Sequence, residues 1–139
     1  SHMVTFAGYR EDMLEILQTA DIFLFPSYQE GLPMALLEAM ASGLPVICSD
    51  IRGSQDLMGE ILTQTDTAKI CAGGIMIKKA DDVSAYSQAI RHLLDTDTPS
   101  HLSARLQELG QNNRRLSEAF SSDSVIKKMN TIYERLCRG

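Results

Sequence analysis

Residues 21–50 read DIFLFPSYQEGLPMALLEAMASGLPVICSD, and this stretch decides the fold. Its first apolar run, Ile22–Phe25, has the length of a strand that is covered on both faces, as the strands of parallel sheets are. Pro33 suits the first turn of a helix, which we expect over residues 34–42 because glycine and proline follow. Val46–Cys48 is the next strand. The stretch therefore predicts a β-α-β crossover with two parallel strands and a right-handed connection.

The flanking segments extend this pattern in both directions. Upstream, Val4–Phe6 is a short β-type run, and apolar positions recur at helical spacing over residues 13–20. Downstream, we expect a helix over residues 53–63, a polar, threonine-rich excursion over 64–71 and another strand over 73–77. These elements place one βα unit before the crossover and a further strand after it.

The last part of the chain, from residue 81, has helical periodicity that is broken by turn and cap residues at 97–100 and 121–123. We therefore predict an α/β fold, a Rossmann-like parallel sheet with flanking helices and a helical C-terminal tail. Residues 4–139 are expected to form one domain. Residues 1–3 are interpreted as a cloning scar.

The composition excludes several classes of protein. The chain has 139 residues, a net charge of −5 and 44% apolar residues, which is typical of one globular domain with its own core. Lysine and arginine do not cluster, so we expect no nucleic-acid partner. No apolar run approaches the roughly 20 residues of a membrane-spanning helix. Cys48, Cys71 and Cys137 fit neither a disulfide framework nor a zinc site, and they predict reduced thiols in a cytoplasmic protein.

Polar loops that contain glycine follow the predicted parallel strands. In an open parallel sheet, ligands bind in the crevice beyond the carboxyl ends of the strands, and these loops are residues 7–10, 26–32 and 49–54. The helix that begins after Pro33 directs its first N–H groups and the positive end of its dipole to the same edge. The sequence therefore predicts a site for an anionic ligand, such as a phosphate, at this edge.

Two carboxylates accompany the helix that follows Pro33. Glu38 lies among apolar and small residues, and two hypotheses stay open for it. It accepts hydrogen bonds from a vicinal diol such as a ribose, or it belongs to a solvent-exposed stripe on a buried helix. Glu30 either contacts the ligand or is a loop acid that complements the helix dipole. Gly31 has a backbone role in both cases.

Other signals are weaker. Residues 49–54 are either an ordinary turn into a helix or a second anion contact through Gly53 and Ser54. His92 and His101 fall in predicted surface helices or at their ends, and no cluster of His, Cys, Asp or Glu has the spacing of metal ligands. Two basic pairs lie on amphipathic helices, where a solvated face competes with a peripheral membrane contact as the explanation. These pairs are Arg114–Arg115 and Lys127–Lys128.

The densest motifs resemble those of a known family, the family 4 retaining glycosyltransferases with the GT-B fold, in their C-terminal, donor-binding domain. The match is dense through residue 57 and includes the Glu30 and Glu38 pair. Residues 74–77 and the helix from Asp82 are similar to the family's next strand and helix. The matching segments are FAG (6–8), ADIFLFPS (20–27), EGLPMALLEAMA (30–41), GLPVI (43–47) and DIRG (50–53).

The resemblance implies a role for each matching residue. Glu38 would hold the ribose hydroxyls of a nucleotide sugar, and Glu30 would be the carboxylate of the catalytic site, facing the sugar and the diphosphate. The implied donor-binding residues are Gly8, Ser27, Glu30, Gly31, Leu32, Met34 and Glu38. Arg52, Gly53 and Ser54 are implied as further donor contacts.

The resemblance also implies the chemistry. The family retains anomeric configuration, and its usual front-side mechanism needs no protein nucleophile and no metal, because fixed cations and helix dipoles stabilise the leaving diphosphate. The segment IRGSQDL (51–57) is similar to that of bacterial O-antigen and capsule transferases, which implies a UDP-hexose or UDP-N-acetylhexosamine donor. The acceptor would be a lipid-linked saccharide at the inner face of the cytoplasmic membrane, bound through an N-terminal domain.

The family has parts that this sequence does not contain. Its C-terminal domain begins with two further βα units, which carry an arginine and a lysine that grip the diphosphate, and an acceptor-binding domain precedes them. We therefore expect the chain alone to be inactive, and its unpaired strand edges to favour a dimer or a swapped oligomer. The alternative is a non-catalytic α/β binding or interaction module that retains the motif.

Overall fold

The computed structural model describes residues 3–137, apart from the side chains of residues 133 and 135–137. Its centre is a five-stranded sheet with the strand order β1-β2-β5-β4-β3. Three neighbouring strands are parallel: β1 (Phe23–Phe25), β2 (Val46–Ser49) and β5 (Gly74–Ile77). Two antiparallel strands complete the other side, β4 (Ala68–Cys71) and β3 (Ile61–Gln64).

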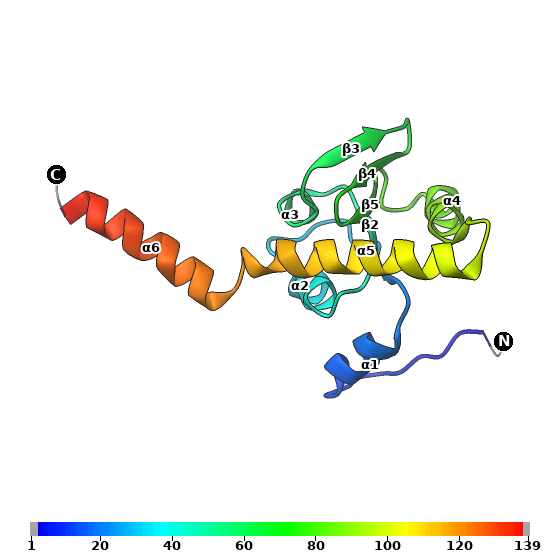
Figure 1. The fold of residues 1–139 in the computed structure, drawn as a ribbon, viewed down its shortest axis with the longest axis horizontal. Coiled ribbons are helices and arrows are strands. Elements are labelled where there is room, and N and C mark those ends of the chain that lie inside the picture. Colours follow the sequence, from blue (N-terminus) through cyan, green and yellow to red (C-terminus); the bar gives the residue numbers. More distant parts are fainter. Residues whose placement is uncertain (1–2, 138–139) are drawn as a thin grey trace.

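Helices surround this sheet (Figure 1). The long α5 crosses the molecule, and α6 projects away from the body that the other elements form. None of the helices in residues 3–137 combines the length and the apolar character needed to cross a membrane. The helix bounds are Met13–Thr19 for α1, Met34–Ala41 for α2, Arg52–Gln55 for α3, Val83–Leu94 for α4, Pro99–Glu118 for α5 and Ser122–Cys137 for α6.

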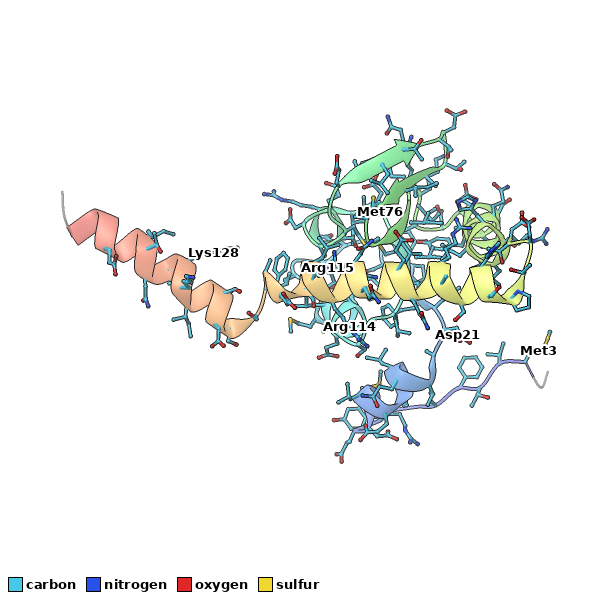
Figure 2. The ribbon with its side chains drawn as sticks, in the orientation of Figure 1. Met3, Asp21, Met76, Arg114, Arg115 and Lys128 are labelled. Atoms are coloured by element: carbon cyan, nitrogen blue, oxygen red, sulfur yellow. The ribbon has the colours of Figure 1, made fainter. Side chains whose placement is uncertain are left out.

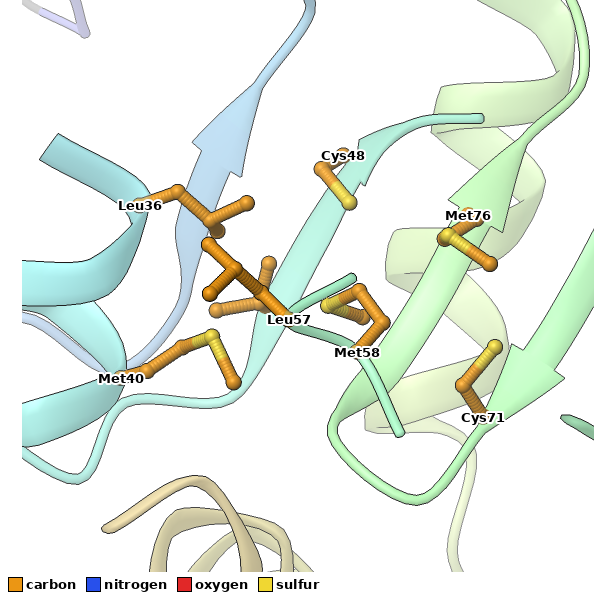
Figure 3. Packing of buried hydrophobic residues seen from close by; sticks show 8 residues of the cluster. Leu36, Met40, Cys48, Leu57, Met58, Cys71 and Met76 are labelled. Atoms are coloured by element: carbon orange, nitrogen blue, oxygen red, sulfur yellow. The ribbon is translucent and has the colours of Figure 1, made fainter. Parts of the chain in front are cut away.

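Strand β2, which lies between β1 and β5, divides its side chains between two cores, because neighbouring residues of a strand point to opposite faces of a sheet. Val46 and Cys48 pack in a cluster with α2, whereas Ile47 packs in a second cluster with α4. Helices α2 and α4 therefore cover opposite faces. Figure 3 shows the first cluster, which consists of Leu36, Met40, Val46, Cys48, Leu57, Met58, Cys71 and Met76.

Helix α5 packs directly on the backbone at the amino ends of β2 and β5. A β-carbon on Gly110 would lie 2.2 Å from the carbonyl oxygen of Gly43, so only glycine allows this approach. The fully buried Asn113 donates from Nδ2 to the carbonyl oxygens of Leu44, at 2.6 Å, and Gly73, at 2.8 Å. These contacts hold the amino ends of β2 and β5 against α5, at the opposite ends of the strands from the loops that follow them.

Most of the expected elements are confirmed. The β-α-β crossover of residues 21–50 forms, with β1 and β2 parallel and α2 between them. The helix over 13–20, the strand over 73–77 and the helices beyond residue 81 are present with small shifts of their ends. The α/β fold class with flanking helices and a helical tail is therefore confirmed, although the sheet is mixed rather than wholly parallel.

The strand expected at Val4–Phe6 is wrong. The side chain of Phe6 is 96% exposed and that of Val4 is 64% exposed, and these residues form no strand in the described structure. A strand needs a neighbour to receive its main-chain hydrogen bonds, and no sheet strand lies beside this segment. The segment therefore stays extended and exposed.

The expectations for residues 53–71 are also wrong in part. The helix is only the four-residue α3, and Gly59, with φ of +73°, turns the chain into β3 instead. The threonine-rich excursion contains β4, which pairs with β3 on one side and β5 on the other. The β-branched residues Ile61, Thr63 and Ile70 favour strands once partners are available.

Candidate functional site

Three loops leave the carboxyl ends of the parallel strands at one edge of the sheet, where α/β proteins bind ligands. They are residues 26–33 after β1, residues 50 and 51 after β2, and residues 78–82 after β5. No side chain of the described residues caps the first turn of α2, whose N-cap residue is Pro33. The amides of that turn are therefore available to an anion.

The loop after β1 is held in one shape by its own polar groups. The hydroxyl of Ser27 donates to Oε1 of Glu30 at 2.9 Å, and the amide of Ser27 donates to the carbonyl oxygen of Phe25 at 3.1 Å. Glu30 and Gly31 are exposed, whereas Ser27 is half-buried. The predicted catalytic carboxylate thus lies on the surface with one oxygen oriented by a hydroxyl.

The loop after β1 touches the start of α3. A β-carbon on Gly53 would lie 2.3 Å from the carbonyl oxygen of Gly31 and 3.0 Å from that of Glu30. Gly53 and Ser54 are buried there, and Arg52 is exposed. The structure therefore brings Ser27, Glu30 and Gly31 together with Gly53, as a shared ligand site requires.

Leu32 and Met34 follow in the same loop and in the first turn of α2. Their side chains are 49% and 55% exposed. Two apolar side chains with this exposure lie beside the amides of the first helical turn. They can contact a ligand that those amides bind, because neither is used in the core.

Glu38 lies on α2 and faces a different hollow. It lines an open pocket of about 490 Å³ with residues of α1 and with Arg114 of α5, which donates to the carbonyl oxygen of Ser42 at 3.1 Å. Figure 2 labels Arg114 on α5 above α2. Glu38 is exposed, as the solvent-stripe hypothesis requires, and it borders a hollow, as the diol hypothesis requires.

Gly8 is not brought to the other predicted residues. It lies in the exposed segment before α1 with φ of +65°, and no described atom beyond its chain neighbours lies within 4 Å of where its β-carbon would be. The segment lacks a sheet neighbour, for the reason given for Val4–Phe6. The donor role of Gly8 thus has no support from its position.

The sequence reasoning missed an ion pair beside this site. Asp50, directly after β2, pairs with Lys69 of β4 at 2.5 Å and accepts from Nε2 of Gln55 at 2.8 Å. The side chains of Asp50 and Lys69 are only 9% and 19% exposed. Lys69 comes from the hairpin that was interpreted as an excursion, so its spacing in the sequence carried no signal of this contact.

The described residues offer no thiolate and no metal centre. Burial raises the pKa of the Cys48 thiol to about 12, against a smaller opposing effect of the Ser54 hydroxyl. Burial also raises the pKa of Cys71. Both cysteines are free thiols, as expected, and Cys137 lies outside the described side chains. Within residues 3–137, no group of three or more His, Cys, Asp or Glu could hold a metal ion.

The two basic pairs lie on different helices, and both pairs are exposed. Arg114 and Arg115 lie on α5, and Lys127 and Lys128 lie on α6, beyond the body of the molecule (Figure 2). All four are exposed, as both a solvated face and a membrane contact require. No described contact tests the alternative of a membrane surface.

Known proteins share this sequence pattern. Residues 1–96 match the family described as "Glycosyl transferases group 1". The N-acetyl-alpha-D-glucosaminyl L-malate synthase of Bacillus anthracis is 29% identical over 135 residues, which are 97% of this chain and 31% of that protein. The UDP-Gal:alpha-D-GlcNAc-diphosphoundecaprenol alpha-1,3-galactosyltransferase of Escherichia coli is 47% identical over 51 residues, which are 37% of this chain and 13% of that protein.

A solved structure has the same fold. Sucrose-phosphate synthase from Thermosynechococcus elongatus superimposes with a TM-score of 0.63 at 26% identity, over 88% of this chain and 27% of that one. The chain therefore spans less than a third of the length of each of these three proteins. The family match includes every predicted site residue from Gly8 to Ser54.

Proposed function

Because the chain belongs to the glycosyl transferases group 1 family, we propose that it is the nucleotide-sugar-binding part of a retaining glycosyltransferase. The observation that carries the proposal is the contact between two loops at the carboxyl edge of the sheet. There the Ser27–Glu30 hydrogen bond, the close approach of Gly53 to Gly31 and the uncapped first turn of α2 adjoin one another.

In this proposal the donor lies across that edge. The diphosphate accepts hydrogen bonds from amides at the start of α2, which the positive end of the helix dipole strengthens. Glu30, with Gly31, Leu32 and Met34, faces the sugar. Glu38 lies four residues beyond Met34 and therefore on the same side of α2, and there it accepts hydrogen bonds from the ribose hydroxyls where the donor extends into the neighbouring hollow. Arg52 lies beside the loop contact and supplies a positive charge for the diphosphate.

The reaction follows from these roles. The acceptor hydroxyl attacks the anomeric carbon from the side of the leaving diphosphate, and the diphosphate takes its proton as the bond to the sugar breaks. Fixed positive charge and the helix dipole stabilise the diphosphate. The reaction then needs no protein nucleophile and no metal cofactor.

The substrates are proposed from the relatives. A relative whose name includes UDP-Gal and a diphosphoundecaprenol acceptor supports a UDP-hexose or UDP-N-acetylhexosamine donor and a lipid-linked saccharide acceptor. We place the whole protein in the cytoplasm, at the inner face of the membrane, in bacterial surface polysaccharide synthesis. Because the chain spans less than a third of these relatives, we expect residues 1–139 alone to transfer no sugar.

An open sheet edge supports self-association of the chain. Among the described residues, strand β1 pairs with β2 alone, and Leu24 on β1 is 43% exposed. Unpaired strand edges promote association, so we expect a dimer or a swapped oligomer. Analytical ultracentrifugation across a concentration series tests this, and a concentration-independent monomer would contradict it.

Saturation-transfer NMR tests the donor site. We expect UDP and UDP-N-acetylhexosamines to receive saturation mainly at their ribose protons, equally with magnesium and with a chelator present. Glu38→Ala should weaken binding at least tenfold, because a charged hydrogen bond to the ribose is lost. Glu134→Ala removes an exposed carboxylate from the projecting α6 and serves as the matched control.

Two outcomes contradict this assignment. A folded wild-type chain that transfers no saturation to any of these nucleotides would count against a donor site and favour a non-catalytic module. Equal binding by Glu38→Ala and Glu134→Ala would remove Glu38 from the site.

A further inference from the structure

A chain of hydroxyl groups runs from helix α4 to the loop that carries Glu30. The hydroxyl of Tyr86 on α4 donates to Oγ of Ser49 at 3.3 Å, and Oγ of Ser49 donates to the carbonyl oxygen of Ser27 at 2.5 Å. Oγ of Ser27 in turn donates to Glu30. Three segments far apart in the sequence are thereby linked to one carboxylate.

The direction of these hydrogen bonds follows from their donors. A carbonyl oxygen can only accept, so the single proton of Ser49 points to Ser27, or to the more distant oxygen of Phe25 at 3.3 Å. The lone pairs of Ser49 remain to accept the proton of Tyr86. Ser49 is therefore both the acceptor for α4 and the donor for the loop.

The depth of these groups argues against an incidental contact. Ser49 is 1% exposed and Tyr86 is 7% exposed, and the ring of Tyr86 packs in the apolar cluster with Ile47 and Ile77. A buried hydroxyl costs free energy unless it is hydrogen-bonded. Phenylalanine and alanine would fill the same space without that cost. The two hydroxyls serve the main chain of the loop, whose residues are otherwise mostly exposed.

The loop depends on this attachment. Of its residues 26–31, Ser27 alone is tied to the sheet through both its amide, to Phe25, and its carbonyl, to Ser49. The side chain of Ser27 then orients Glu30 three residues later. A shift of the Ser27 backbone moves the carboxylate with it.

We propose that Ser49, oriented by Tyr86, is a positioning residue that fixes the loop of residues 26–31 and thereby aims Glu30 at the sugar of the donor. The inference rests on the proposed function for the role of Glu30. It gives Ser49, a buried residue of β2, and helix α4, on the opposite face of the sheet from α2, a part in sugar recognition.

The test compares affinities for UDP and for a UDP-sugar. Ser49→Ala and Tyr86→Phe are titrated, by NMR, with UDP and with whichever of UDP-GlcNAc, UDP-GalNAc or UDP-galactose the wild-type chain binds most tightly. We expect Ser49→Ala to weaken the UDP-sugar about tenfold and UDP little, since one hydrogen bond that aims Glu30 is lost. Tyr86→Phe should act in the same direction by about threefold, because its hydrogen bond is longer and it acts through Ser49.

Matched controls separate positioning from general destabilisation. Ser117→Ala removes a buried hydroxyl that donates to the carbonyl oxygen of Arg114 on α5, and Tyr9→Phe removes an exposed phenol. Both should leave the ratio of the two affinities unchanged. Equal weakening of UDP and UDP-sugar in Ser49→Ala would overturn the inference, because it would indicate a structural role only.

Amide hydrogen exchange without ligand provides the second readout. Ser49→Ala should speed exchange and shift amide resonances at residues 27–31, and Ser117→Ala should not. If the wild-type chain binds none of the nucleotides, the proposed function fails. If the chain binds them while exchange in the loop is the same in Ser49→Ala as in wild type, the inference alone fails.

Discussion

Val4–Phe6 and Val46–Cys48 are both short apolar runs of strand type, yet only one of them is a strand. Val46, Ile47 and Cys48 are fully buried in β2, between β1 and β5. Val4 and Phe6 are 64% and 96% exposed in the segment before α1. In Figure 1, β2 lies inside the sheet, and the segment before α1 that contains Val4–Phe6 lies outside it, near the N-terminus.

The difference lies in what each run can pair with. Residues of β2 pair with β1 on one side and β5 on the other, and helices cover both faces. The N-terminal run has no sheet partner among the described residues. Strand propensity therefore expresses the fit to a pleated, covered surface, and not an intrinsic preference of the backbone.

The largest effect that we expect from a single substitution at neutral pH comes from truncating Ile47, in the middle of β2. Ile47→Ala should lower the free energy of unfolding by about 3 kcal/mol, because it removes buried methyl groups and leaves a cavity against α4. Urea denaturation followed by circular dichroism measures this. Phe6→Ala, the counterpart in the exposed run, should change stability by less than about 0.5 kcal/mol. A similar loss of stability in Ile47→Ala and Phe6→Ala would contradict this explanation of the two runs.

A steric version of the comparison uses two glycines. Gly110→Ala should cost about 2 kcal/mol, because its β-carbon would overlap the carbonyl oxygen of Gly43 while helix propensity recovers part of the strain. Gly31→Ala meets no described atom within 4 Å and should stay within about 0.5 kcal/mol. Thermal unfolding of both variants gives the result. Full stability of Gly110→Ala would show that α5 can move off the strands.

The burial of β2 also predicts a loss of stability at high pH. Burial raises the pKa of Cys48 from 9.0 to about 12, so above pH 9 the unfolded chain loses this proton first. The unfolded state then binds fewer protons than the folded state, and stability falls by up to about 1.4 kcal/mol per pH unit until the folded thiol titrates. Below pH 9 this group has no effect.

Denaturation at a series of pH values measures that slope. Cys48→Ala should flatten it, but not abolish it, because burial also raises the pKa of Cys71 and of Tyr86. An unchanged slope in Cys48→Ala would mean that the thiol is more accessible than its place in β2 indicates.

The smallest effect on stability is expected in the hairpin of β3 and β4, whose burial is intermediate between that of β2 and that of the exposed run before α1. Lys69→Met keeps the apolar stem but breaks the pair with Asp50, and should cost about 1 kcal/mol. Lys79→Met, in the exposed loop after β5, is the control and should have no measurable effect. Thermal unfolding at low salt measures the difference between the two variants, because salt weakens the attraction between charges. A gain in stability for Lys69→Met would show that the desolvation of the pair outweighs its attraction.

The candidate site was predictable in part. The loops after β1 and β2 could be placed at one edge because parallel strands end together, and the structure brings Ser27, Glu30 and Gly31 next to Gly53. Asp50 with Lys69, and Ser49 with Tyr86, could not be found, since each pair joins residues that lie on different elements. Gly8 was assigned by resemblance, and its position depends on a strand that does not form.

The sequence by itself determined the β-α-β crossover, the ends of α2 and the helical character after residue 81. These features follow from local rules: apolar runs, helical spacing, and proline and glycine at helix boundaries. Only the tertiary structure decided which β-type run became a strand, that residues 61–71 form a hairpin, and which hydroxyl holds the Glu30 loop. The hydrogen bonds that hold the Glu30 loop to β2 and α4 join residues 22 and 37 positions apart in the sequence. Such contacts are decided by the packing of the whole chain.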